Sequence, residues 1–528
     1  MIKTMHDHRL HRLGTRRYAA RAWFLCVPLA AFACTSSRGD TQDSAPADTG
    51  GAGGQSTGVG GAGGVGSGGV VVTGGAIGSG GVKATGGVVG SGGRVGTGGV
   101  VASGGALATG GAGGSGGKVS TGGTVGSGGT SVIPGGVDGG SSTTCLGASL
   151  LASLGKDTVL VGGSMSDTTA AKAPFDGRYL YLSGGLFDGV APCASCATGC
   201  TTGGNSCSNA GSGCAWWGCW QWDQDPPGKY VSDFVGANEK AAPVQLPMFT
   251  YYEELQASGL GEGTAQVAAL NDAAFLTRYF ADWRFVLQNI GTHPALLHIE
   301  PDFWGYVEQL NSDPHSVPAK VTTANATDCA SYENSAAGVA KCMIHMVRVY
   351  APKAKVGLHA SAWGTKFDVF GNSDAKLDVA GEAKKMSTFL TALGATDGDF
   401  IVTDPSDRDA GYYQANGRNT WWDDTNATLP NFHQAFTWTK AVAEALNLPV
   451  IYWQIPVGNM KLDNTKNHYR DNRVDYFFAH MDEVAAAHIV GLFFGAGNGD
   501  TTTLETDGGN LVSKTTSYRA AGGAKVCK

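Results

Sequence analysis

The sequence predicts an α/β protein built on a single (β/α) barrel of seven or eight parallel strands. Short apolar runs alternate with helical patterns from about residue 145 to the end of the 528-residue chain, which is typical of a parallel sheet with helical crossovers. Polar and aromatic residues gather where the apolar runs end, as they do at the carboxyl face of a barrel. A doubly wound open sheet is the alternative, but no glycine-rich phosphate turn follows any of these runs.

Eight apolar runs are the expected strands. The first run in chain order is the one that a seven-stranded barrel would lack. They span residues 158–161, 179–183, 246–252, 295–300, 355–360, 400–404, 450–454 and 489–494. Apolar residues at steps of three and four within 276–290, 339–350 and 432–446 predict helices between the strands.

The N-terminal residues 1–33 are expected to be a secretory signal peptide. Arginines, among them Arg12, Arg16, Arg17 and Arg21, precede an apolar run from Ala22 to Ala33 that is too short to cross a bilayer. The ending Ala31-Phe-Ala-Cys34 is similar to a bacterial lipoprotein box. We therefore expect an exported bacterial protein, held at the outer membrane or cell surface by a lipid on Cys34, with ordinary cleavage and release as the alternative.

Residues 34–140 are expected to form a disordered, glycine-rich linker. The segment repeats Gly-Gly with Ser, Thr, Val and Ala between, and so little side-chain surface cannot offset the entropy that glycine loses on ordering. A flexible tether is the favoured interpretation, with a glycine-rich solenoid as its rival. Residues 141–528 would then be the barrel domain, with a cysteine- and tryptophan-rich insertion at 187–230.

The cysteine pattern predicts disulfide bonds. Of 12 cysteines, Cys26 and Cys34 belong to the signal region, and an even number in an exported chain favours pairing. We expect the six cysteines from 193 to 219 to pair among themselves and Cys145 to pair with Cys527. A zinc knuckle at Cys193 is the alternative, but no further ligands follow at zinc-finger spacing. No metal or cofactor is expected.

The charge balance argues against a nucleic-acid partner. A formal net charge of −7 with 15% charged side chains provides no basic face. A neutral polymer is the more plausible partner, and we expect the protein to be a monomer.

The predicted strand ends supply the candidate site residues. In the richest stretch, 295–306, His298 and Glu300 should point into the barrel, with Leu297 and Ile299 pointing out and Asp302 just past the rim. Carboxylates and aromatics suit sugars, because glycosidic bonds need an acid and a facing carboxylate. The candidate catalytic residues are Asp302, Glu300, Asp404 and Asp407, and the candidate substrate-binding residues are Tyr252, Glu253, His298, Trp304, His359, Trp363, Trp453, Gln454, Trp216 and Trp217.

The stretch that ends in Glu300-Pro-Asp302 also resembles the second active-site signature of the family 6 glycoside hydrolases, the inverting cellulases. Cys329, Cys342-Met-Ile-His and the segment 352–364 follow in an order similar to that family's disulfide-flanked helix and next strand. The resemblance implies that Asp302 is a general acid, that Cys329 pairs with Cys342 and that hydrolysis inverts the anomeric centre. Inversion needs carboxylates roughly 6.5 to 9.5 Å apart, and the candidate partners are Asp404, Asp407 and Asp500.

These residues predict a secreted glycoside hydrolase that cleaves a β-linked polysaccharide by general acid/base catalysis. We expect Glu300 and the apolar wall of Phe303 and Trp304 to raise the pKa of Asp302. A non-catalytic carbohydrate-binding surface lipoprotein is the alternative, and it would need no second carboxylate facing Asp302. A structural surface protein would leave the polar strand ends unexplained. Taken singly, His298 could equally be a core histidine, and Asp404 could merely shape a turn.

Overall fold

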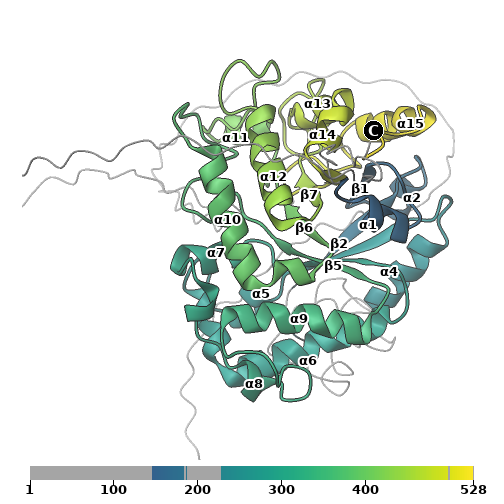
Figure 1. Cartoon of the computed structure of the whole chain (residues 1–528). Helices are drawn as coiled ribbons and strands as arrows, with labels where there is room; N and C mark the ends of the chain where they lie inside the picture. The colour runs from purple at the N-terminus through teal and green to yellow at the C-terminus, as the bar shows by residue number, and fades with distance from the viewer. Residues whose placement is uncertain (1–144, 184–185, 187–227, 498–499, 527–528) are drawn as a thin grey trace, which may run out of the picture. The chain divides into compact units, whose positions relative to one another are not determined.

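Eight parallel strands form a closed barrel in chain order, with β1 paired to β8 (Figure 1). The computed structural model describes residues 145–183, 186, 228–497 and 500–526. Closure excludes the open sheet and confirms the predicted fold class, and each predicted run overlaps one strand. The strands are β1 (Leu160–Gly163), β2 (Gly177–Leu182), β3 (Leu246–Tyr251), β4 (Leu296–Ile299), β5 (Lys355–His359), β6 (Phe400–Thr403), β7 (Val450–Ile455) and β8 (Ile489–Phe494).

Helices surround the barrel, with α6 beside α9 and α10 beside α12 (Figure 1). The helices of the described residues are α1 (Ala148–Ser153), α2 (Asp167–Ala170), α4 (Lys229–Glu239), α5 (Glu254–Ser258), α6 (Ala273–Ile290), α7 (Phe303–Leu310), α8 (Val321–Ala324), α9 (Ala336–Tyr350), α10 (Val379–Leu393), α11 (Ala410–Ala415), α12 (Phe432–Leu446), α13 (Arg473–Ala479), α14 (Met481–Ala486) and α15 (Asn510–Ala520).

The alternation of side chains along β4 follows the predicted pattern up to the end of the strand. Leu297 and Ile299 pack in the layer between strands and helices, while Leu296 lies in the separate cluster that fills the barrel. His298 shares the inner side, with its ring 4.8 Å from that of Trp453. Glu300 does not: its backbone takes the left-handed φ of 50°, and its carboxylate accepts a hydrogen bond from Tyr279 of α6. The expectation that Glu300 points into the barrel was therefore wrong.

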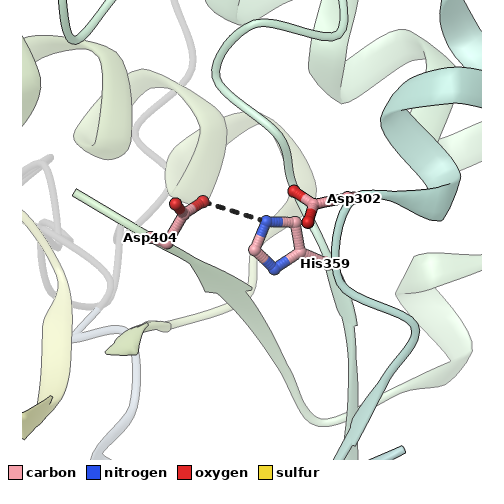
Figure 2. Close-up of side chains that lie close together, drawn as sticks. All are labelled: Asp302, His359 and Asp404. Carbon is pink, nitrogen blue, oxygen red and sulfur yellow. Dashed lines mark ion pairs between the residues drawn. The ribbon is translucent and has the colours of Figure 1, made fainter. Parts of the chain in front are cut away.

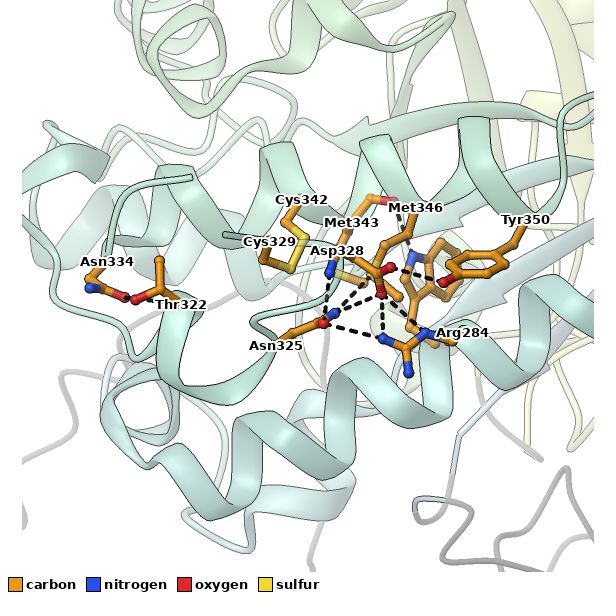
Figure 3. The surroundings of a disulfide bond; sticks show 11 residues. Arg284, Thr322, Asn325, Asp328, Cys329, Asn334, Cys342, Met343, Met346 and Tyr350 are labelled. Atoms are coloured by element: carbon orange, nitrogen blue, oxygen red, sulfur yellow. Dashed lines mark hydrogen bonds and ion pairs between the residues drawn. A yellow bond between two sulfur atoms is a disulfide. The ribbon is translucent and has the colours of Figure 1, made fainter. Parts of the chain in front are cut away.

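A disulfide between Cys329 and Cys342 ties the loop after α8 to α9, with a Cα–Cα distance of 5.4 Å (Figure 3). This confirms the pairing that the family resemblance implied. Asp328, next to the bridge, accepts hydrogen bonds from Arg284 Nε of α6 at 3.0 Å and from the Tyr350 hydroxyl at 2.9 Å. The bridge and this ion pair fix the same loop against two helices.

The two ends of the barrel domain meet. Thr158 and Lys525 form an antiparallel bridge, and the amide of Val159 donates to the carbonyl of Ala524 at 2.9 Å. Cys145 is disulfide-bonded, and its predicted partner Cys527 lies outside the described residues.

The signal peptide, Cys34, the linker, the six cysteines from 193 to 219 and nearly all of the predicted insertion also lie outside the described residues, so these expectations remain predictions. Within the described part, no helix has the length and apolar character needed to span a membrane.

Candidate active site

Three polar side chains from consecutive strand ends meet at the carboxyl face of the barrel. Asp302 follows β4, His359 ends β5 and Asp404 follows β6. One ligand atom from each lies within 4.8 Å of the other two, and His359 Nε2 is 3.2 Å from Asp404 Oδ1 (Figure 2). Asp302 and His359 are only 3% and 1% exposed. Two of the three, Asp302 and Asp404, were predicted as catalytic and His359 as a substrate ligand; the structure brings them together.

The backbone places Asp302 in this group. Pro301 ends the strand ladder, and Asp302 stands at the start of α7 with a φ of 65° and no side-chain capping bond. Its carboxylate is therefore free of the role that an aspartate usually takes before a helix. Among the described residues, Asp302 Oδ1 is buried without a hydrogen-bond partner. A substrate hydroxyl, a leaving-group oxygen or a cation would supply the missing partner.

The pKa of Asp302 is raised, as predicted, but the neighbouring charge that raises it most is that of Asp404 and not that of Glu300. Burial and then the charge of Asp404 raise the pKa of Asp302 well above its usual value. Glu262 and Asp407 raise it further, while His359 opposes them. Glu300 is not among these causes, because its carboxylate points toward α6. Like charge and desolvation both favour a neutral acid at this position.

Asp404 carries the same kind of perturbation. Burial raises the pKa of Asp404 well above its usual value, and the charges of Asp407 and Asp368 add to the effect. Two buried carboxyl groups this close cannot both ionise cheaply, so they favour sharing one proton. The pair can therefore offer one acid and one carboxylate at the same time.

Behind the pair, a buried hydrogen-bonded chain runs across three strands. Thr250 Oγ1 lies 3.3 Å from His298 Nδ1, and His298 Nε2 lies 3.0 Å from His359 Nδ1. Burial, then His359, lowers the pKa of His298 well below its usual value. Burial lowers the pKa of His359 to about 4, against the charge of Asp302. Both imidazoles are therefore neutral at neutral pH.

A cavity of about 70 Å³ opens beside Asp404. Trp363, Asp368, Asp407 and Arg418 are among its lining residues. The Trp363 ring packs against the ring of Tyr306, with centroids 4.8 Å apart, and its indole N–H is buried without a partner among the described residues. The cavity therefore offers an aromatic wall and an unsatisfied donor next to a carboxylate.

Asp407, which was predicted to be catalytic, lines this cavity, but its carboxylate already accepts hydrogen bonds from neighbouring side chains. Its carboxylate accepts from the Tyr413 hydroxyl and from Arg408. The paired guanidinium opposes the rise that burial causes in the pKa of Asp407. Asp407 therefore forms an ion pair with Arg408. Its catalytic role stays a prediction.

Glu300 belongs to a second acidic cluster behind the β3–β4 ends. Its Oε1 accepts from the backbone N–H of Glu253 at 3.2 Å, from that of Glu254 at 3.0 Å and from the Tyr279 hydroxyl at 2.7 Å. Burial raises the pKa of Glu300 to about 8 and that of Glu254 to about 9. These bonds hold the loop after β3, which makes a structural role for Glu300 the simpler interpretation of its surroundings.

The other predicted ligands fall in different places. Tyr252 lies near Asp302, whose charge adds to burial in raising the pKa of the phenol. Trp304 is buried and donates from Nε1 to the carbonyl of Ile299 at 3.1 Å, so it supports the loop. Trp453 lies beside His298 in the barrel, and Gln454 accepts from the Tyr181 hydroxyl. Glu253 is buried, and Trp216 and Trp217 lie outside the described residues.

Sequence reasoning missed three residues in and behind the site. Tyr181 of β2 lies near both carboxylates, since the charges of Asp302 and Asp404 help to raise its pKa. Its alternation with Tyr179 in a predicted strand was a usable signal. Thr250 anchors the histidine chain, and Glu262, in the loop after α5, acts on Asp302 and accepts from Tyr306 at 2.8 Å. Nothing in the sequence around Glu262 points to the site.

Asp302, His359 and Asp404 are also the described residues whose ligand atoms cluster closely enough to hold a metal ion. Two carboxylates and one imidazole can bind several kinds of divalent cation, so these three residues do not select a particular metal.

Comparisons with known proteins give distant structural likenesses only. No family model matches the chain, and no curated protein does. Among solved structures, the chain resembles an endo-β-1,4-mannanase of glycoside hydrolase family 26 from Cellulomonas fimi, at 10% identity and a TM-score of 0.39, over 71% of this chain and 74% of that one. It also resembles the endoglucanase Cel6 from Mycobacterium tuberculosis, at 14% identity and a TM-score of 0.25, over 44% of this chain. The match spans only 56% of the endoglucanase.

The chain also resembles a solved structure of another chemistry. The carboxyl transferase domain of Rhizobium etli pyruvate carboxylase aligns at 10% identity with a TM-score of 0.31, over 72% of this chain and 50% of that one. The fold and the site define a (β/α)8-barrel protein with a close carboxylate pair, Asp302 and Asp404, at the carboxyl ends of its strands. Any assignment of chemistry must come from the side chains.

Proposed function

We propose that the protein is a glycoside hydrolase that cleaves a β-linked polysaccharide. The observation that carries the proposal is Asp404, a second carboxylate that faces Asp302 in a buried pair. A protein that only binds carbohydrate needs aromatic walls but gains nothing from two carboxylates that repel each other in a buried site. Perturbed acids in a cleft at strand ends are the pattern of a catalytic site.

In the proposed reaction Asp302 donates its proton to the glycosidic oxygen as the bond from that oxygen to the anomeric carbon breaks. Asp404 attacks the anomeric carbon and forms a glycosyl ester. A water molecule then cleaves the ester, giving its proton to Asp302 and its oxygen to the sugar. Both groups return to their starting protonation states, with one acid serving in turn as general acid and general base.

The spacing of the pair favours this two-step route over the inversion that the sequence resemblance implied. The nearest oxygens of Asp302 and Asp404 lie within 4.8 Å. Retaining enzymes hold their carboxyl groups roughly 5 to 5.5 Å apart, whereas inverting enzymes need roughly 6.5 to 9.5 Å for a water. We therefore propose retention.

The surroundings suit a neutral sugar ring. Trp363 and Tyr252 offer ring faces and polar edges near the pair, and the described residues of the cavity beside Asp404 include Arg418 and Asp368 as hydrogen-bonding groups. Export through the signal and tethering through Cys34 are part of the proposal, because polymeric glycans are met outside the cell.

The test is digestion of a panel of β-glucans, mannans and xylans with the protein from Cys34 onward, followed by reducing-end measurement. The proposal expects new reducing ends from at least one polymer. Binding to a polymer without any hydrolysis would favour the carbohydrate-binding lipoprotein instead.

A further inference from the structure

Two neighbouring side chains of the site, Asp302 and His359, each carry a buried polar atom that bonds to nothing. Among the described residues, Asp302 Oδ1 and His359 Nε2 have no hydrogen-bond partner, although the two residues are only 3% and 1% exposed. A buried polar atom without a partner carries a desolvation cost. Both atoms can offer a lone pair and both lie beside Asp404, so together they suit a ligand with positive charge.

The spacing of the three residues fits a single cation. His359 Nε2 is 3.2 Å from Asp404 Oδ1 (Figure 2), and one ligand atom from each of Asp302, His359 and Asp404 lies within 4.8 Å of the other two. Zinc binds nitrogen and carboxylate oxygen at roughly 2.0 to 2.2 Å, which places adjacent ligands of a tetrahedral or octahedral ion roughly 2.8 to 3.6 Å apart. The contact between His359 and Asp404 has this spacing and yet is no hydrogen bond, as expected of two ligands of one ion.

The barrel holds the three groups firmly. They stand at the carboxyl ends of β4, β5 and β6, which pair side by side. Behind them, His298 Nε2 lies 3.0 Å from His359 Nδ1, so the ring is supported through the nitrogen that does not face Asp404. Histidines that bind a metal almost always have such a partner on their other ring nitrogen.

The surrounding charges also favour a cation. The carboxylates of Glu262 and Asp407 act on Asp302, and Asp407 acts on Asp404 as well. The charge of Asp407 is offset by its ion pair with Arg408. The cavity beside Asp404, of about 70 Å³, gives an ion a route to the pair and room for water as a further ligand. Ligand number, spacing, support and entry path are the features by which a metal site is judged.

We propose that Asp302, His359 and Asp404 form a binding site for a divalent cation, and that a bound cation blocks the proposed hydrolysis. A cation on both carboxylates occupies the oxygens through which Asp302 would protonate the leaving group and Asp404 would attack the anomeric carbon. The bound cation and the reaction therefore exclude each other. The blocking rests on the proposed function, whereas the cation site does not. The proposal also revises the expectation from the sequence that no metal is bound.

Binding is measured by titrating zinc chloride into the EDTA-treated protein from Cys34 onward at pH 7, by calorimetry. We expect one site that is lost in Asp302→Asn and in His359→Gln. Because the loss of an outer-shell partner alone costs roughly 10- to 100-fold in metal affinity, each of these variants should raise the Kd at least roughly 100-fold. Asp500→Asn is the matched control, since Asp500 is exposed and paired with Lys466, and it should keep the wild-type Kd. No zinc binding, or equal Kd values in all four proteins, would overturn the proposal.

X-ray absorption of zinc bound to the wild-type protein identifies the donor atoms without any variant, and so decides the matter even if a variant fails to fold. We expect nitrogen and oxygen neighbours at roughly 2.0 to 2.2 Å, with the outer scattering of an imidazole ring. Sulfur neighbours at roughly 2.3 Å would place the ion on cysteines, such as those between residues 193 and 219, and would overturn the proposal.

Hydrolysis tests the second half of the proposal. We expect full turnover in EDTA. With zinc at ten times its Kd, mass action leaves roughly one tenth of the protein free, so turnover should fall about tenfold and return when EDTA is added. Unchanged turnover at saturating zinc, or loss of turnover in EDTA, would overturn the blocking.

The binding and hydrolysis measurements separate this inference from the proposed function. Zinc binding at the three residues in a protein that cleaves no polymer would sink the proposed function and leave the cation site standing. Hydrolysis in a protein that binds no zinc would do the reverse.

Discussion

His359 Nε2 lies 3.2 Å from Asp404 Oδ1, at the carboxyl ends of neighbouring strands β5 and β6. The contact is close, but His359 Nε2 has no hydrogen-bond partner among the described residues. Asp302 lies on the other side of the same ring (Figure 2), and its Oδ1 is likewise buried without a partner among the described residues. Two carboxyl groups this close favour sharing one proton, so one can act as the acid while the other is a carboxylate, as glycoside hydrolysis requires.

The stereochemistry of the products is the first prediction. The nearest oxygens of Asp302 and Asp404 lie within 4.8 Å, closer than the roughly 6.5 to 9.5 Å that inverting enzymes keep between their carboxyl groups for a water. We expect the first product seen by ¹H NMR to keep the β configuration of the substrate. Initial release of the α anomer would rule out the two-step route and favour the inversion implied by the family 6 resemblance.

The pH dependence of stability is the second prediction. The pKa of Glu300 is about 8 in the folded protein, against roughly 4.3 for an unperturbed glutamate. Between these values the folded state holds a proton that the unfolded state has lost, so this group makes stability fall as pH rises. The contribution is at most about 1.4 kcal/mol per pH unit.

Glu300→Gln is the variant that isolates this contribution, because its amide oxygen can still accept from Tyr279 and the two backbone N–H groups. We expect urea unfolding between pH 5 and pH 8 to show a shallower loss of stability in the variant than in the wild type. Asp302 and Asp404 contribute slopes of the same sign to both proteins and cancel in the comparison. Parallel stability curves would show that Glu300 is ionised in the fold.

The disulfide gives a third prediction. Cys329 and Cys342 are 13 residues apart, and on the chain-entropy model a loop of this size contributes roughly 3 kcal/mol by restricting the unfolded chain. The double variant Cys329→Ala/Cys342→Ala should lose that order of stability in urea unfolding. Because the Arg284–Asp328 ion pair remains in the variant, the loop should stay in place. A loss well below 1 kcal/mol would mean that the unfolded chain is already restricted between residues 329 and 342 without the bridge.

The fold could be predicted because buried parallel strands have a plain sequence pattern. The run Leu296–Ile299 is buried on both faces, and Pro301 follows it where the ladder ends. The candidate acid, Asp302, stood out for the same reason. Its partner could only be narrowed to three aspartates, since which strand ends face each other depends on how the barrel closes.

Other parts of the site were beyond sequence reasoning. The outward turn of Glu300 follows from a single left-handed residue, which a period-two pattern cannot anticipate. Thr250 looks like any β-branched strand residue until its hydroxyl is seen beside His298. Contacts of this kind come from neighbouring strands that are far apart in the chain.

The central claim, that Asp302 and Asp404 form a working acid pair, is tested most directly by Asp302→Asn and Asp404→Asn. Asparagine keeps the shape but can neither donate the proton of Asp302 nor attack as Asp404, so each variant should lose roughly 100-fold or more in turnover while still binding the polysaccharide. Asp500→Asn is the matched control, because Asp500 is exposed and ion-paired with Lys466 at 2.8 Å, and it should keep wild-type turnover. Near-wild-type turnover in Asp302→Asn, measured as reducing ends released per protein molecule, would contradict the account.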